Sequence, residues 1–382
     1  HYLGALPSPD FAHDRTVFAA TFEGLYVSTS GGDGWRWLDV LQPQIVRNLA
    51  LSPQFADDGR LWLSTYGLGL LEVDTLAGTD GPPPHKRLDT LDWMFPDGIA
   101  VSPDLAHDGT LMVGAPNRLL LSTDGGASAQ PTLSAKKSFA RALAFAPDYA
   151  RSGIAFAYLS TYTGTNPLAN RFARTGDRVA SWQDTNIEDV EDMVFGSDWE
   201  ASGRMYAVGP DGLFRSLDRG LTFARVESLD ARGCCSVALA RGAPPEKDPV
   251  GPAPDVLLVC SRLTGLYLSR DDGATWRHLD GLPAGTRFDF VELSPGFAGD
   301  GTAFAGPRTD GVFVTRDGGT TWARSPGGAR IVLTMDRSPT FARDRVLLVG
   351  SYDGAWISRD AAASWEPLPV VVPAGWTPVF SK

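Results

Sequence analysis

The chain has 382 residues and a formal net charge of −11, because 45 acidic side chains outnumber 34 basic ones. A surface of this sign repels nucleic-acid phosphates and anionic lipid headgroups, so we expect no nucleic-acid partner and no membrane insertion. No apolar run approaches the roughly 20 residues that a membrane-spanning helix needs. The 42 glycines and 28 prolines indicate a folded chain with many short strands and turns.

A short segment of the form Ser-Pro-Asp-Phe-Ala-x-Asp recurs along the chain with small variations. Its copies begin at Ser8, Ser52, Ser102, Ala146, Gly196, Ser294 and Ser338. Successive copies are about 44 to 50 residues apart, the period of a four-stranded propeller blade, except for one double-length gap after Gly196. That gap holds one degenerate repeat with apolar runs at 237–239, 256–259 and 265–267. The spacing therefore predicts eight repeats.

Each repeat contains four short apolar runs separated by turn residues, as the seventh shows at 290–293, 302–305, 311–314 and from Trp322 onward. This pattern is typical of strands in a sheet that is covered on both faces. No segment has helical periodicity over three turns. We therefore expect an all-β chain in which residues 1–382 form a single β-propeller of four-stranded blades. Eight blades fit the repeats best, and seven are the alternative if the segment before Ser8 does not supply an inner strand.

A polar hairpin of the form Ser-x-Asp-x-Gly-x-Thr-Trp lies between the third and fourth strands of most repeats. Recognisable copies begin at Ser28, Ser122, Ser216, Ser269, Thr315 and Ser358. In such a turn the aspartate accepts hydrogen bonds from nearby backbone amides, and glycine supplies a positive φ. We expect these aspartates to hold turns together and not to catalyse a reaction. The second and fourth repeats keep only remnants, Val73-Asp74 and Ala180-Ser181-Trp182.

This hairpin resembles the Asp-box, or BNR, repeat of β-propeller proteins, and the resemblance covers nearly the whole chain. Asp-box propellers include sialidases, endo-acting glucanases and single-propeller photosystem assembly factors, and they are often extracytoplasmic. The resemblance therefore implies a secreted or otherwise extracytoplasmic protein. A chain that starts at His1 is also what we expect of a processed product.

The loops that lead into the innermost strands of a propeller share one face with the loops between second and third strands, at the mouth of the central channel, where ligands usually bind. Aligning the inner strands places these residues at equivalent positions: Arg47, Asp97, Arg141, Glu191, Cys235, Asp289 and Ile331. Neighbouring loop residues complete the predicted binding site, which comprises Arg47, Trp93, Asp97, Arg141, Tyr162, Glu191, Arg287, Asp289, Arg330 and Tyr352. The alternative is a lining of mutually neutralising ion pairs around a hydrated channel.

The three cysteines, Cys234, Cys235 and Cys260, are too few for a disulfide framework. Cys234 and Cys235 open the inner strand of the sixth repeat, and Cys260 closes the next, antiparallel strand. A disulfide from Cys260 to one of the pair is therefore geometrically reasonable, with buried thiols as the alternative. The cysteine spacing does not fit a zinc site, and the five scattered histidines fit neither a copper centre nor a Ser-His-Asp triad. We expect no metal and no cofactor.

Two functions remain, and the sequence leaves open whether the chain is an enzyme. The first is a binding or assembly module that recognises a protein or a glycan at the channel mouth. The second is a glycoside hydrolase that uses carboxylates at the mouth, with Asp97, Glu191 and Asp289 as candidates. These carboxylates lie two repeats apart. The nearest string to the Phe-Arg-Ile-Pro motif of the sialidases is Phe214-Arg215-Ser216-Leu217, on a blade strand. We therefore favour the binding module.

Overall fold

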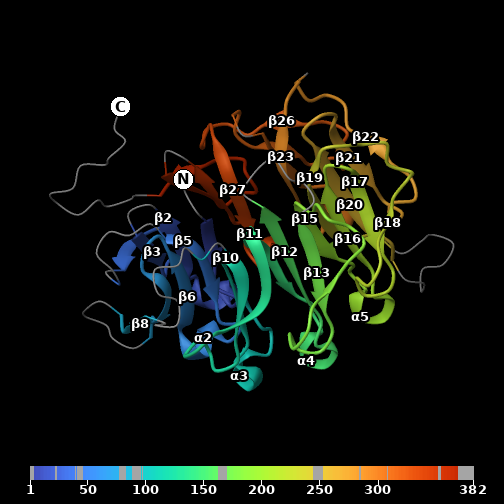
Figure 1. Cartoon of the computed structure of the whole chain (residues 1–382). Helices are drawn as coiled ribbons and strands as arrows, with labels where there is room; N and C mark the ends of the chain where they lie inside the picture. Colours follow the sequence, from blue (N-terminus) through green and yellow to red (C-terminus); the bar gives the residue numbers. More distant parts are fainter. Residues whose placement is uncertain are drawn as a thin grey trace.

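The computed structural model describes residues 4–21, 24–38, 40, 46–76, 83–87, 96, 98–161, 170–243, 253–283, 285–307, 309–351 and 354–368. These residues form seven antiparallel sheets, and the helices among them are seven single turns of four residues each. Figure 1 shows the sheets following one another in chain order around the molecule, from blue on the left through green and yellow to red. The prediction of an all-β chain is confirmed, and the fold is a β-propeller.

Six of the sheets have four strands in chain order, and each corresponds to one sequence repeat. The first and second repeats form β1 (Gly4–Pro7), β2 (Val17–Thr21), β3 (Gly24–Ser28) and β4 (Arg36–Leu38), then β5 (Val46–Leu51), β6 (Arg60–Thr65), β7 (Gly69–Asp74) and β8 (His85–Arg87). The fifth and sixth form β15 (Asp192–Phe195), β16 (Met205–Gly209), β17 (Gly212–Ser216) and β18 (Ala224–Arg225), then β19 (Cys234–Arg241), β20 (Asp255–Ser261), β21 (Gly265–Ser269) and β22 (Arg277–His278). The seventh and eighth form β23 (Phe288–Leu293), β24 (Ala303–Pro307), β25 (Phe313–Thr315) and β26 (Ala323–Arg324), then β27 (Val332–Arg337), β28 (Leu347–Ser351), β29 (Gly354–Ser358) and β30 (Glu366–Pro367).

The remaining sheet has six strands and spans the third and fourth repeats. Its strands are β9 (Gly98–Val101), β10 (Leu111–Ser122), β11 (Gln130–Phe145), β12 (Ala155–Thr161), β13 (Arg171–Thr175) and β14 (Gln183–Asp184). Strand β10 pairs with β9 through 111–114 and with β11 through 118–121, and the positive φ of Asn117 lies between the two segments. Strand β11 in turn pairs with β12 through 138–145. Each long strand therefore takes the place of two consecutive strands of a regular repeat.

The Ser-Pro-Asp-Phe-Ala-x-Asp segment forms a single helical turn between the first and second strands of a repeat. The turns are α1 (Phe11–Asp14), α2 (Phe55–Asp58), α3 (Leu105–Asp108), α4 (Tyr149–Ser152), α5 (Trp199–Ser202), α6 (Phe297–Asp300) and α7 (Phe341–Asp344). In α6 the first residue, Phe297, is buried, and the final Asp300 accepts hydrogen bonds from Ser294 Oγ at 2.6 Å and from the Thr302 amide at 2.8 Å. Figure 1 shows α2, α3, α4 and α5 along the lower side of the molecule. These turns therefore mark one face of the propeller, opposite the predicted mouth.

Side-chain hydrogen bonds of the aspartates hold the Asp-box-like hairpins together, as predicted. In the seventh repeat Thr315 donates to Asp317 at 2.8 Å, and Asp317 accepts from the amide and hydroxyl of Thr321 at 2.9 and 2.6 Å. These hydrogen bonds from Thr321 lower the pKa of Asp317. The fourth repeat corrects the prediction that it had lost its box, because Thr175 donates to Asp177 at 2.7 Å in the same way. Arg178 and Val179 there adopt the positive φ that glycine provides elsewhere.

The ring closes between the first and the eighth repeats. Strand β1 contacts both β27 and β28, and a cluster of buried apolar residues joins Phe11 and Tyr26 to Leu348 and Ile357. On the same seam Arg359 pairs with Asp33 at 2.8 Å and donates to the carbonyl of Gly31 at 3.1 Å. The N-terminal strand is thus the inner strand of the first repeat. The core is built in this way at each junction, where the apolar faces of neighbouring sheets pack together.

Candidate functional site

The inner strands carry a recurrent β-bulge at the end that faces the predicted mouth. The register between first and second strands skips one residue at Arg47, Arg141, Cys235, Asp289 and Leu333. A bulge adds one residue to a strand and redirects its side chain, which is why bulges are frequent beside binding sites. The bulged residues agree with the predicted alignment of the inner strands in the second, fourth, sixth and seventh repeats. In the eighth repeat the bulged residue is Leu333 and not the predicted Ile331.

Arg262 ties two of the predicted site residues together. It lies in the turn between β20 and β21, on the same face as the bulges. Its Nε donates to Asp289 Oδ1 at 2.9 Å, and its Nη1 donates to the two carboxylate oxygens of Glu191 at 2.8 and 2.6 Å. Glu191 precedes β15 and Asp289 lies in β23, so one side chain of the sixth repeat joins the fifth and the seventh. We call these three residues the Arg262 clamp.

Burial lowers the pKa of Arg262, but the hydrogen bonds to Asp289 and Glu191 outweigh burial and raise it. The guanidinium is therefore a permanent cation. Its side chain is 39% exposed, against 33% for Glu191 and 24% for Asp289. The clamp thus lies at the water interface, where a ligand can reach it.

A pocket of about 740 Å³ opens beside the clamp. Its lining comes from the sixth and seventh repeats and comprises Arg262, Gly285, Thr286, Arg287, Asp289, Pro307, Thr309 and Asp310. Among the residues that the structure describes, the lining is mainly polar and includes two arginines and two aspartates. Arg324 forms an ion pair with Asp310 at 3.2 Å, and Arg262 forms one with Asp289. Arg287 is exposed and makes no ion pair or side-chain hydrogen bond with the part of the chain that the structure describes. Its exposed side chain lines the pocket.

The structure brings together three of the ten predicted site residues. Glu191 and Asp289 meet in the clamp, and Arg287 lines the adjoining pocket. Arg47, in the bulge of β5, and Arg330, before β27, are not among the residues that line this pocket. The side chain of Arg141 is not described. Trp93, Asp97, Tyr162 and Tyr352 lie outside the described residues.

Sequence reasoning missed Arg262 because it follows the second strand of the degenerate sixth repeat, where no motif marks the turn. The only available signal was its place between Cys260 and the apolar run at 265–267.

Polar contacts also join neighbouring inner strands along the channel wall. Asp192 of β15 accepts hydrogen bonds from Ser236 Oγ at 2.9 Å and the Val237 amide at 3.0 Å, both on β19. Arg337 of β27 pairs with Glu292 of β23 at 3.2 Å. Burial raises the pKa of Asp192 and of Glu292, and burial together with the charge of Glu292 raises the pKa of Asp336 to about 7. One ion pair, between Arg337 and Glu292, and the hydrogen bonds of Asp192 thus connect neighbouring inner strands beyond the predicted mouth residues.

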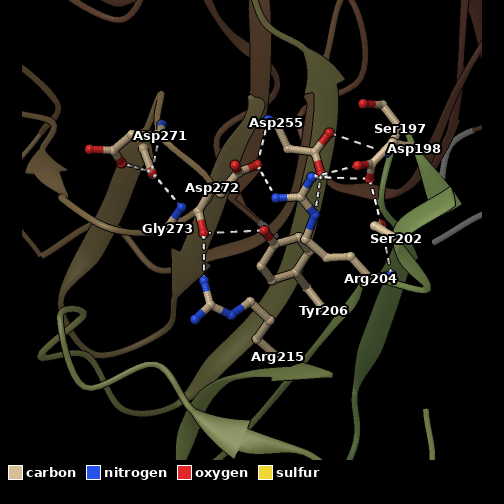
Figure 2. A network of polar contacts seen from close by, with 11 residues as sticks. Ser197, Asp198, Ser202, Arg204, Tyr206, Arg215, Asp255, Asp271, Asp272 and Gly273 are labelled. Atoms are coloured by element: carbon tan, nitrogen blue, oxygen red, sulfur yellow. Dashed lines mark hydrogen bonds and ion pairs between the residues drawn. The ribbon is translucent and has the colours of Figure 1, made fainter. Parts of the chain in front are cut away.

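A second arginine cluster lies at the opposite face, between the fifth and sixth repeats. Figure 2 shows Arg204 surrounded by Asp198, Asp255 and Asp272. The closest approaches are 3.0, 3.5 and 2.5 Å, and the side chain of Asp255 is fully buried. Asp255 also accepts from the Ser197 amide at 3.1 Å. No helical turn of the sixth repeat falls within the described residues, and this cluster fixes the corresponding corner. We assign it a structural role.

The three cysteines are free thiols, and all are buried. Within the described residues no group of three or more His, Cys, Asp or Glu side chains is arranged to hold a metal ion. No helix in the described ranges is both long and apolar enough to cross a membrane.

Comparison with protein-family models and with curated protein sequences finds no match. Solved structures do match the fold. Sqt1 of Saccharomyces cerevisiae has a TM-score of 0.61 at 12% identity, covering 97% of this chain and 94% of that one. The computationally designed Ika8 protein has a TM-score of 0.58 at 11% identity, covering 90% and 93%. An ancestral GH74 enzyme has a TM-score of 0.57 at 15% identity, and this chain covers 46% of its length. At these identities the likeness shows the β-propeller fold alone.

Proposed function

We propose that the protein is an extracytoplasmic binding module that recognises a protein or a glycan at its channel mouth. The observation that carries this proposal is the polar pocket beside the Arg262 clamp, built from the loops that the propeller gathers on one face. Arg262 pairs with Asp289, and Arg324 pairs with Asp310. Arg287 is therefore the one cation of the described lining without an ion pair to another described residue. Such a pocket suits a neutral, hydroxyl-rich or amide-rich ligand that offers Arg287 an oxygen acceptor.

The arrangement of the carboxylates favours binding over glycoside hydrolysis. An inverting hydrolase needs room for a water molecule between its two carboxyl groups, and a retaining one needs a carboxylate that can attack the sugar. Here the guanidinium of Arg262 lies between Glu191 and Asp289 and donates hydrogen bonds to both. Neither carboxylate is in a position to act without breaking the clamp. Hydrolysis is therefore an outcome that the experiment must be able to detect, and we do not expect it.

We further propose that the ring contains eight blades. The six-stranded sheet covers two sequence repeats, each with its own helical turn, α3 and α4, and its own stapled hairpin, at Asp124 and Asp177. The six four-stranded sheets supply one blade each. A density map with eight radial sheets supports this count, and a map in which β9 to β14 form one continuous blade contradicts it.

The test is a binding screen of the full chain against immobilised oligosaccharides, including cello-, xylogluco- and chito-oligosaccharides, and against a peptide array. Soluble products are analysed from the same incubations. We expect retention of one ligand class without cleavage, and loss of retention in Arg287→Ala. The matched control is Arg343→Ala, which removes an exposed arginine from α7 on the opposite face. Retention that survives Arg287→Ala contradicts the assignment of the pocket, and released product contradicts the binding-module assignment.

A further inference from the structure

The thiols of Cys235 and Cys260 meet inside the sixth repeat. Their Sγ atoms are 2.8 Å apart, and both residues are buried in the apolar cluster that joins the sixth repeat to the seventh. Cys234 instead packs in a different cluster, with Tyr206 and Val208 of the fifth repeat. Of the two adjacent cysteines, only Cys235 therefore faces Cys260.

The bulge in β19 explains this pairing. Cys234 is opposite Ser261 and Ser236 is opposite Cys260, so Cys235 is the extra residue between two regular pairs. The bulge turns its side chain toward Cys260 on the partner strand. A disulfide has a sulfur–sulfur distance of 2.03–2.05 Å, so the two sulfur atoms need to approach by less than about 1 Å.

This pair lies directly beneath the mouth pocket. Cys260 is two residues before Arg262, and the Sγ of Cys235 contacts the carbonyl oxygen of Phe288 at 3.2 Å, next to Asp289. The two thiols thus lie next to the end of β20 that leads to Arg262 and next to the start of β23 that carries Asp289. A covalent bond here fixes the end of β20 from which Arg262 extends.

We propose that Cys235 and Cys260 form a reversible disulfide that braces the Arg262 clamp under oxidising conditions. The oxidant is a small-molecule disulfide such as oxidised glutathione. One protein thiolate attacks it and releases one reduced glutathione. The second protein thiolate then displaces the other, so that two protons and two electrons leave the protein and two glutathione thiols form. An extracytoplasmic compartment would maintain such a bond, and a reducing one would open it.

Burial raises the pKa of Cys260 well above its usual range, and that of Cys234 to about 12. The attacking species is the thiolate, so the reaction should be slow at neutral pH and faster in mildly alkaline buffer. The closed loop is 25 residues long. A cross-link of this length, in a chain of this size, should raise the melting temperature by about 4 °C.

The experiment treats the folded full chain with oxidised glutathione in mildly alkaline buffer, then denatures it, blocks the remaining thiols by alkylation and maps the peptides by mass spectrometry. We expect the loss of two hydrogen atoms, a cross-linked peptide joining Cys235 to Cys260, an alkylated Cys234, the rise in melting temperature, and reversal by dithiothreitol. Cys235→Ser and Cys260→Ser should each abolish the cross-link, and the matched control Cys234→Ser should keep it.

Three results overturn the proposal: a folded chain whose three thiols are all alkylated after oxidation, a chain that carries glutathione adducts without an internal cross-link, or a bridge that involves Cys234. If Cys235→Ser does not fold, the same map of the wild-type chain still decides between the outcomes. Failure here would leave the binding proposal untouched, because that proposal depends on Arg287 and the pocket.

Discussion

The carboxylate of Asp336 should make the protein less stable at neutral and alkaline pH than at acid pH. Asp336 lies on the inner strand β27, where it is half-buried. Burial raises its pKa from 3.8 to about 7, the negative charge of Glu292 adds to the effect, and Arg337 opposes it. Asp192 and Glu292, the other acids of neighbouring inner strands, also have raised pKa values. Asp336 is thus held most favourably in its protonated form.

The sign and size of the effect follow from the two pKa values. Below pH 3.8 both the folded and the unfolded chain keep the proton, so the group has no effect on stability. Between pH 3.8 and about 7 the unfolded chain loses the proton first, and the folded state becomes less stable as the pH rises. Each unit of difference corresponds to about 1.4 kcal/mol, which gives an upper limit of about 4 kcal/mol above pH 7. Because the residue is only half-buried, this limit is discounted, and we expect about 2 to 4 kcal/mol.

The variant Asp336→Asn removes the ionisation and nearly keeps the shape. Urea unfolding of wild type and variant should give nearly equal free energies at pH 4, and a more stable variant at pH 8. The control is Asp124→Asn, because hydrogen bonds from Ser128 lower the pKa of Asp124 to about 2. That substitution should destabilise the protein at pH 8, with the loss shrinking as the pH falls below 4. An Asp336→Asn variant that is less stable at pH 8 would refute the reasoning.

Three further substitutions test the clamp, a hairpin and the ring closure. Arg262→Met should lower the free energy of unfolding by about 1 to 2 kcal/mol, a value discounted for partial exposure, and should lose ligand retention; an unchanged stability with full retention contradicts the clamp. Ser216→Ala removes a buried hydroxyl that bonds Asp218 at 2.7 Å and the Gly220 amide at 2.8 Å, so it should cost about 1 to 3 kcal/mol in urea titration, whereas the exposed Ser134→Ala should cost nothing measurable. Arg359→Met should cost about 1 kcal/mol and increase hydrogen exchange in both β3 and β29, whose hairpins it joins; exchange that changes in β29 alone would show that the seam does not depend on this contact.

Local physical rules made the architecture predictable from the sequence. The turn motifs specify their own hydrogen bonds within a few residues, so Thr315 and Asp317 can be assigned without knowing the rest of the fold. The hairpin of the fourth repeat could not be predicted from the glycine pattern, because Arg178 and Val179 adopt the positive φ that glycine adopts in other repeats. The segment before Ser8 does supply the first inner strand, β1 at Gly4–Pro7, which ends two residues later than the Tyr2–Ala5 range that its apolar residues suggest.

The site was only partly predictable, because it depends on how loops of different repeats approach one another. Glu191 and Asp289 could be found from their equivalent positions at the starts of inner strands. Arg262 could not, since its role arises from a turn that reaches both neighbouring repeats. Asp336 was missed for a different reason. A charged residue inside an apolar run looks like an exposed strand position, and only the ring shows that it lies at the channel wall.

The central claim is that the protein binds its partner in the pocket beside Arg262 and leaves it intact. The most direct measurement is calorimetric titration of the full chain with the retained oligosaccharide or peptide, followed by chromatography of the same sample. The account predicts one binding event per chain, its loss in Arg287→Ala, its persistence in Arg343→Ala, and a chemically unchanged ligand. Binding that persists in Arg287→Ala, or a ligand recovered in fragments, would contradict it.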